Sequence, residues 1–226
     1  MDCGFGPRNL ATRLARLGLE PGDISAIVVT HEHTDHIGGV AACARRYGWD
    51  VFLTHGTLAA APLEGVFPEV IDSHTAFDIG DIAVRPFPVP HDAREPAQFV
   101  FSEGDSCLGV LTDAGCVTPH MIEMLSACNA IIIECNHDAE MLAAGRYPPH
   151  LKRRIAGRFG HLDNAAAADL VSRLDRAQLR HVVAAHLSEE NNTPALARAA
   201  LAAVLGCEPE WIGVADQETG CGWREL

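Results

Sequence analysis

Four side chains that commonly bind metal ions lie within six residues near the N-terminus of this 226-residue chain. The set is His31, His33, Asp35 and His36. Imidazole nitrogens and carboxylate oxygens are usual ligands of zinc and similar divalent ions. A histidine-rich surface loop is the plain alternative, but it explains a single histidine better than four ligands in this order. The spacing therefore predicts a metal site, and the number of ligands favours a pair of ions.

A strand and a helix are predicted to position this motif. Residues 24–30 form an apolar run that predicts a buried strand, and residues two apart on extended chain face the same side. His31 and His33 can therefore converge on one ion. The next apolar residues have helical spacing, which predicts a helix over 35–47 that Gly48 ends, with the other two ligands on its first turn. Open α/β sheets usually place their chemistry at the carboxyl ends of strands.

Turn signals divide the rest of the chain into short β-runs and helical patterns. We predict strands over 50–54, 70–72, 76–78, 82–88, 98–102, 107–112, 130–135 and 181–185, and helices over 10–17, 119–128, 138–144, 151–158, 164–174 and 194–205. Residues 211–215 and 221–224 are predicted to form a closing hairpin, and 56–68 is a mixed segment. Strands ahead of helices in two successive blocks predict a layered α/β protein with mixed sheets.

The composition predicts a single domain over residues 1–226, because 48% hydrophobic and 21% charged residues suit one globular core. No apolar run approaches the ~20 residues of a membrane span, and the N-terminus lacks a basic-then-apolar signal pattern. We therefore expect a cytoplasmic protein with no membrane partner. The eight cysteines include no C-x-x-C pair and are predicted to be buried free thiols.

Three further candidate ligands follow other predicted strands, as His31 does. They are His91, Asp113 and His186. Taken singly, each is as readily a core or surface residue, because strands often end in polar residues. Together with the first motif they supply enough ligands for two metal sites.

The order H-x-H-x-D-H followed by Gly-Gly, at residues 31–39, resembles the signature of the metallo-β-lactamase superfamily. The resemblance implies a four-layer αββα sandwich, with two mixed β-sheets flanked by helices. It also implies that His31, His33 and His91 hold one metal and Asp35, His36 and His186 the second, with Asp113 bridging. Nitrogen and carboxylate ligands without cysteine suit zinc and do not exclude manganese or iron. Hydrolysis by a hydroxide held between two cations is then expected, because coordination lowers the pKa of bound water.

Three downstream segments narrow the expected substrate. Residues 132–138, 160–164 and 186–194 are similar to the E-x-N-H-D, G-H-L-x-N and H-L-S-x-x-N-N-x-P elements of the YycJ-type (VicX-type) subfamily. Its members are taken to be metal-dependent exonucleases acting on DNA, so the resemblance implies single-stranded or duplex DNA as the partner. A thioesterase or lactonase acting on a small acyl substrate stays open, as does a non-catalytic metal-binding regulatory module.

Phosphodiester cleavage also needs donors to the phosphate oxygens and an acid for the leaving alkoxide. His161 and His137 are candidates for both tasks, alongside Asp35 at the metal pair. His137 is as readily a residue that starts a helix. Glu134 and Asp2 are predicted to brace the site from behind, although a buried carboxylate bound to backbone and a frayed terminus are their plain alternatives.

A net charge of −13 by itself argues against a nucleic-acid partner, because phosphate binding normally relies on a basic surface. Five basic residues nevertheless fall in a stretch without acidic residues. They are Arg146, Lys152, Arg153, Arg154 and Arg158. A solvated helix face is the default for such a run, but its place between two nuclease-like motifs favours phosphate contact. Asn164 and Ser188 of those motifs are further substrate-binding candidates.

In relatives, the Asp-Cys-Gly element follows two strands and a Gly/Ser-rich turn, whereas here it occupies residues 2–4. We therefore expect the first two strands of the family to be absent and one sheet to expose an edge. A second copy of the chain could cover that edge in a homo-oligomer.

Overall fold

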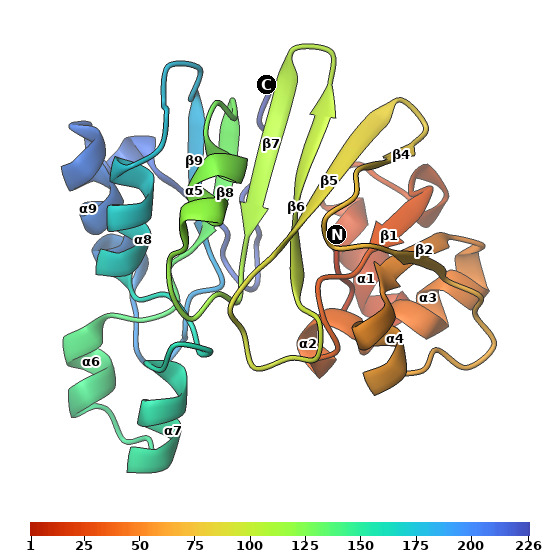
Figure 1. Cartoon of the computed structure of the whole chain (residues 1–226), viewed down its shortest axis with the longest axis horizontal. Coiled ribbons are helices and arrows are strands. Elements are labelled where there is room, and N and C mark those ends of the chain that lie inside the picture. The colour runs from red at the N-terminus through yellow and green to blue at the C-terminus, as the bar shows by residue number, and fades with distance from the viewer.

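Two β-sheets lie face to face at the centre of the molecule, and helices cover the outer face of each (Figure 1). The computed structural model describes residues 1–226. The predicted four-layer αββα arrangement is confirmed by these layers. None of the helices combines the length and the apolar character that a membrane crossing requires.

The smaller sheet is parallel and has three strands. They are β1 (Ala26–Val28), β2 (Asp50–Thr54) and β3 (Glu69–Ile71). Alternate side chains face opposite sides, as extended chain requires. Ile27 and Val51 pack beneath the covering helices, whereas Val28 and Phe52 pack against the larger sheet. The covering helices are α1 (Pro7–Ala15), α3 (Val40–Tyr47) and α4 (His55–Ala60), and the 3-10 turn η1 (Pro21–Asp23) precedes β1.

The larger sheet has seven strands in the order β10-β9-β8-β7-β6-β5-β4. They are β4 (Phe77–Ile79), β5 (Ile82–Pro88), β6 (Ala97–Glu103), β7 (Ser106–Leu111), β8 (Ala130–Glu134), β9 (His181–Ala185) and β10 (Gly213–Val214). The half from β4 to β7 is antiparallel, and the half from β7 to β10 is parallel. The strands β5, β7, β8 and β9 run the same way, so their carboxyl ends meet at one edge.

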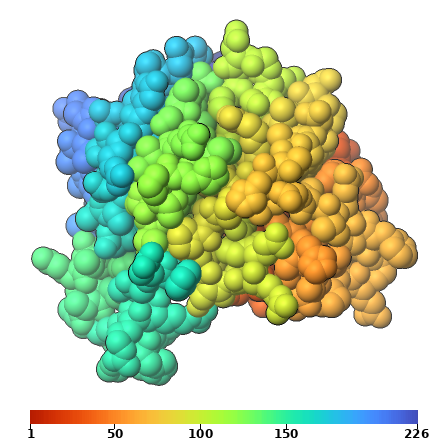
Figure 2. Space-filling model, viewed as in Figure 1, coloured from red at the N-terminus to blue at the C-terminus, as the bar shows by residue number.

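Helices α5 (Pro119–Leu125), α8 (Asn164–Ser172) and α9 (Pro194–Leu205) cover the outer face of this sheet, and the 3-10 turn η2 (Pro209–Trp211) leads into β10. Two short helices, α6 (Ala139–Ala144) and α7 (Pro149–Ile155), instead project beyond the sheet edge (Figures 1 and 2). We call residues 139–155 the α6–α7 arm. The α6–α7 arm lies beside the edge at which the parallel strands end.

The single helix predicted over 35–47 is wrong, because the chain forms α2 (Thr34–Ile37) and then α3 after two glycines. The break has a steric cause. A Cβ atom at Gly39 would lie 1.9 Å from the carbonyl oxygen of Phe5, so only glycine lets the N-terminal segment pass this close. The predicted helix end at Gly48 is confirmed, since this residue adopts the left-handed conformation, with φ 76°.

The predicted closing hairpin is also wrong. Residues 213–214 form β10, which pairs in parallel with β9, and only a single bridge joins Asp216 to Gly220. The Asp216 carboxylate accepts hydrogen bonds from the backbone N–H groups of Glu218 and Thr219, which fixes a tight turn there. The segment 56–68 contains a helix that the sequence did not predict, α4, and the Thr54 side chain caps it by accepting from the Thr57 N–H.

Candidate metal centre

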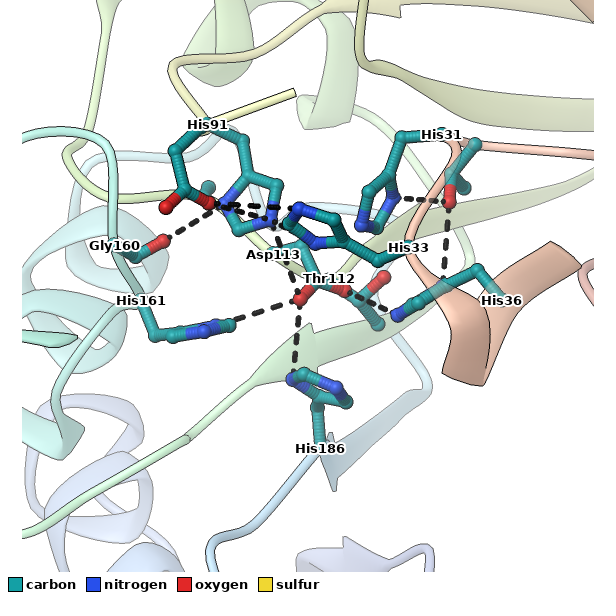
Figure 3. A network of polar contacts seen from close by, with 12 residues as sticks. His31, His33, His36, His91, Thr112, Asp113, Gly160, His161 and His186 are labelled. Atoms are coloured by element: carbon teal, nitrogen blue, oxygen red, sulfur yellow. Dashed lines mark hydrogen bonds and ion pairs between the residues drawn. The ribbon is translucent and has the colours of Figure 1, made fainter. Parts of the chain in front are cut away.

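Six histidine rings from distant parts of the chain gather around Asp113 at the edge where the parallel strands end (Figure 3). Their ligand atoms form four overlapping groups, each with all members within 4.8 Å of one another. The groups are His31, His33 and His91; His31, His36 and Asp113; Asp35, His36 and His186; and Asp113, Glu134, His161 and His186. All seven predicted ligands belong to this cluster. How they divide between two ions stays a prediction.

One buried atom of the cluster has no hydrogen-bond partner, Nε2 of His31, whose side chain is fully buried. Leaving a buried polar atom unpaired costs about 1–3 kcal/mol, so folded proteins rarely tolerate it without a reason. A divalent cation that accepts the lone pair of this nitrogen supplies that reason. The nitrogen and carboxylate donors present here therefore fit metal ions.

The electrostatics of the cluster favour positive charge. Burial alone would lower the pKa of His36, but hydrogen bonds to Asp113, Asp2 and Asp35 raise it to about 12. Burial likewise opposes protonation of His186, and the charge of Asp113 with hydrogen bonds to nearby carboxylates still raises its pKa to about 10. The same contacts hold the pKa values of Asp35 and Asp113 well below their usual range. Metal cations would supply the positive charge that these carboxylates stabilise.

The pKa of His31 is shifted in the opposite direction. Burial, together with the nearby charge of His36, lowers the pKa of His31 to about 3, so its ring is neutral. Burial also lowers the pKa of His91. A neutral imidazole is the form that binds a metal ion, because the coordinating nitrogen must keep its lone pair.

Asp2 braces the first motif from behind. Its Oδ1 accepts a hydrogen bond of 2.8 Å from the Thr30 N–H, and its Oδ2 lies 3.0 Å from Nδ1 of His36. The Thr30 hydroxyl in turn lies 2.9 Å from Nδ1 of His31. Partners of this kind fix the ring orientation of metal-binding histidines, so Asp2 lies where a bracing residue must lie.

Glu134 performs the same task on the opposite side. Its carboxylate is fully buried and accepts from Nδ1 of His161 at 2.8 Å and from Nδ1 of His186 at 2.9 Å. It also accepts from the N–H groups of Ala114 and Leu162, at 2.9 and 3.1 Å. Burial would raise the pKa of Glu134, but the hydrogen bonds from the two rings lower it. One buried carboxylate therefore orients both rings.

Left-handed backbone marks the same positions. Only four residues other than glycine have positive φ, and three of them are Asp2, Asp113 and His186, with φ of 51°, 52° and 56°. This conformation is costly for most residues and concentrates at functional sites, where surrounding structure holds it in place. Here it turns the side chains of Asp113, two residues after β7, and of His186, directly after β9, toward the cluster.

The cluster opens into a cavity of about 640 Å³ between the sheet edge and the α6–α7 arm. Its lining includes His33, Asp35, Asp113, His161 and His186. A second cavity of about 750 Å³, lined by the N-terminal segment and residues 214–218, shares part of this wall. The shared residues are Asp35, Asn136, His186, Ser188 and Glu189. The cluster thus forms the boundary between two open spaces.

The predicted catalytic and substrate-binding residues are only partly brought together. His161 and Ser188 line the first cavity, but His137 and Asn164 do not. His137 is 1% exposed, because its segment pairs with Asp163 and its carbonyl accepts from the Asn164 N–H. Asn164 is buried and exchanges side-chain hydrogen bonds of 2.9 Å with Asn192. Both residues hold the loops together behind the cavity.

Three of the five predicted phosphate contacts already have partners within the chain. Arg146 forms a two-pronged ion pair with Glu190, and Arg154 donates to Asp92 at 2.6 Å. Lys152 donates to the carbonyl of Ala143. Of the basic run, only Arg154 lines the cavity, whereas Arg153 and Arg158 are exposed outside its lining.

Several residues of the site were not identified as candidates from the sequence. Asp92 lies 3.6 Å from Nε2 of His91 and 3.8 Å from Nε2 of His33. Its place directly after His91 was the available signal. Tyr147, Leu151 and Ile155 also line the cavity, and the spacing of Leu151 and Ile155 was the available signal for an apolar helix face.

The chain matches the family model described as "Beta-lactamase superfamily domain" over residues 1–187, and it therefore belongs to that superfamily. It is 36% identical over 223 residues to the exodeoxyribonuclease YycJ of Bacillus anthracis, covering 96% of this chain and 83% of that protein. It is 32% identical over 221 residues to the exodeoxyribonuclease WalJ of Streptococcus pneumoniae, covering 95% and 82%. The resemblance to the YycJ-type subfamily is thereby confirmed.

Among solved structures, the chain is similar to the metallo-β-lactamase fold protein YhfI of Bacillus subtilis, with a TM-score of 0.70. The alignment covers 98% of this chain and 84% of that one at 14% identity. At this identity the likeness concerns the fold, and it agrees with the two packed sheets described above.

Proposed function

We propose that this protein is a metal-dependent exodeoxyribonuclease that hydrolyses phosphodiester bonds of DNA at the cluster around Asp113. The observation that carries the proposal is the cluster itself, with six histidines and their carboxylates opening into one cavity. The 32–36% identity to two exodeoxyribonucleases supports DNA as the substrate. The cluster alone would serve many hydrolytic reactions.

In this proposal two divalent ions, zinc or manganese, are held by two overlapping sets of ligands. The first set is His31, His33 and His91, the second is Asp35, His36 and His186, and Asp113 lies between them. When bound, the ions supply positive charge for the phosphate oxygens and an acidified water for hydrolysis.

His161 is the protein's own group for moving a proton. Its Nδ1 donates to Glu134, so Nε2 is the atom left to face a bound substrate from the cavity wall. Ser188 lies on the same wall, and its hydroxyl oxygen accepts from the Asn191 N–H, which leaves the hydroxyl proton to donate to a phosphate oxygen.

The test is incubation of the zinc- or manganese-loaded protein with end-labelled single- and double-stranded DNA and with RNA. We expect shortening of DNA from its ends by the wild type. His161→Ala should lose at least about 100-fold in rate, the lower bound for a group that transfers a proton in catalysis. Asp35→Ala should lose activity because it removes a candidate ligand of the second ion. His74→Ala is the matched control, because this histidine is exposed in a turn between β3 and β4.

Three outcomes would contradict the proposal. Degradation that Asp35→Ala leaves unchanged would place the activity elsewhere or in a contaminant. Hydrolysis of a thioester or lactone without any cleavage of nucleic acid would favour a small acyl substrate. Binding of single-stranded DNA by the metal-loaded protein without cleavage would favour a regulatory module.

A further inference from the structure

One wall of the metal cavity is apolar, whereas the rest of its lining is mostly polar. The apolar side chains are Tyr147, Leu151 and Ile155. Leu151 and Ile155 are four apart and lie on the same face of α7. Tyr147 lies two residues before α7 and lines the same cavity, so the three side chains form one apolar strip. All three are half-buried. Four of the seven candidate metal ligands line the same cavity: His33, Asp35, Asp113 and His186.

The backbone that carries Tyr147 is held on both sides. Before it, Arg146 pairs with Glu190, with nitrogen–oxygen distances of 2.7 to 3.0 Å. After it, Pro148 and Pro149 fix two successive φ angles. An aromatic ring held in this way loses little conformational freedom when a ligand packs against it.

The arm is also fitted closely against the loop after β9. A Cβ atom at Gly145 would lie 2.6 Å from the side-chain oxygen of Asn191, so only glycine allows this approach. The Asp138 N–H donates to the carbonyl of the same Asn191 at 2.8 Å. The strip is therefore a built surface with a fixed position relative to the cluster.

Charges around the strip suit a phosphate linked to an apolar group. Asp92, Glu189 and Glu190 line the cavity and would repel a phosphate, but Arg154 and Arg146 offset the charges of Asp92 and Glu190. A nucleotide combines a phosphate with a flat base, and aromatic side chains bind bases by stacking whatever their identity. The cavity volume of about 640 Å³ lies within the range of small-molecule sites.

We propose that Tyr147, Leu151 and Ile155 form a nucleobase wall, against which the base next to the scissile phosphate stacks. This inference rests on the proposed nuclease function and adds to it how the substrate is gripped. Tyr147 supplies the stacking face, and the two aliphatic side chains extend it. Because stacking tolerates every base, the wall gives affinity without sequence preference.

The experiment compares two end-labelled single-stranded DNA substrates with the metal-loaded protein. One carries ordinary nucleotides, and the other carries a stable abasic analogue at the position next to the cleaved bond, tested at either end. We expect the wild type to cleave the base-bearing end faster by about 5- to 150-fold, the range that stacking of one base gives. Tyr147→Ala should lose this preference by slowing only on the base-bearing substrate, whereas Tyr147→Phe should keep it.

Phe67→Ala is the matched control, because Phe67 is 99% exposed before β3, on the other sheet, and it should keep the wild-type ratio. Leu151→Gln on the exposed arm gives a second measurement, and it decides the question if Tyr147→Ala fails to fold. A wild-type ratio in Tyr147→Ala, or in Leu151→Gln in that case, would overturn the wall while leaving the nuclease proposal intact. Absence of any DNA cleavage by the wild type would overturn both.

Discussion

The metal cluster and the α6–α7 arm face each other across one cavity, but they are held in place in opposite ways. The cluster is fixed by buried hydrogen bonds, such as those of the fully buried Glu134. The arm is tied to the body by exposed ion pairs, since the side chains of Arg146 and Arg154 are 80% and 61% exposed. Exposed pairs of this kind contribute little to stability because water and salt screen them, whereas breaking a buried network is far more costly.

The two kinds of support match two different structural requirements. A cluster that must hold reacting atoms in fixed geometry gains from a rigid, buried frame. A wall that only stacks against a base needs less exact placement than reacting atoms do, so surface ion pairs and a close backbone fit are enough to position it. Three comparisons test the contrast, beginning with the buried frame.

The largest effect is expected from Glu134→Gln. The glutamine side chain has one acceptor oxygen in place of two, so it cannot serve both histidine rings and both backbone N–H groups. We expect metal affinity to fall by about 10- to 100-fold and the free energy of unfolding to drop by about 1–3 kcal/mol. Metal competition titration and thermal melting measure the two quantities. Glu69→Gln, at an exposed position of β3, is the control.

A Glu134→Gln protein that binds metal as tightly as the wild type would show that the buried carboxylate does not orient the cluster. The contrast between frame and arm would then lose its main support.

A smaller effect is expected from Asp2→Asn. Asparagine tolerates the left-handed backbone of this position and keeps an acceptor for the Thr30 N–H. In the wild type, Nδ1 of His36 lies 3.0 Å from a carboxylate oxygen of Asp2. The neutral amide of asparagine is a weaker acceptor for that proton than the carboxylate. We expect metal affinity to fall by about tenfold, the lower end for such bracing groups. The same metal competition titration measures this affinity, with Asp78→Asn as the control. An unchanged affinity in Asp2→Asn would show that Asp2 does not support the cluster.

The sequence predicts the cluster better than the arm for a physical reason. Strand ends deliver side chains to one edge of a parallel sheet, so His91, Asp113 and His186 could be found by local pattern alone. The ion pairs of the arm join residues 44 and 62 positions apart, and no local pattern reports them. The burial of His137 has the same kind of cause, because it follows from pairing with the distant Asp163.

The fold shows the same limit. The long apolar runs of β8 and β9 predicted those strands within a residue. The two-residue β10 carries too few side chains for a pattern, and its partner is set by the edge of the sheet that β9 leaves open. The break between α2 and α3 depends on the passage of Phe5 beside Gly39, which is also a long-range contact.

The smallest effect is expected from Arg154→Ala on the arm. It removes a pair between two partly exposed side chains, so the free energy of unfolding should change by less than about 1 kcal/mol. It also leaves the Asp92 carboxylate unneutralised in the cavity, so KM for DNA should rise by up to about fivefold with kcat nearly unchanged, and the rise should shrink as salt is added. Arg173→Ala removes a comparable exposed pair with Asp169, distant from the cavity lining, and should leave KM unaltered. A Tm drop in Arg154→Ala as large as that of Glu134→Gln would mean that the exposed pair contributes as much to the folding free energy as the buried carboxylate does, and the contrast between cluster and arm would not hold.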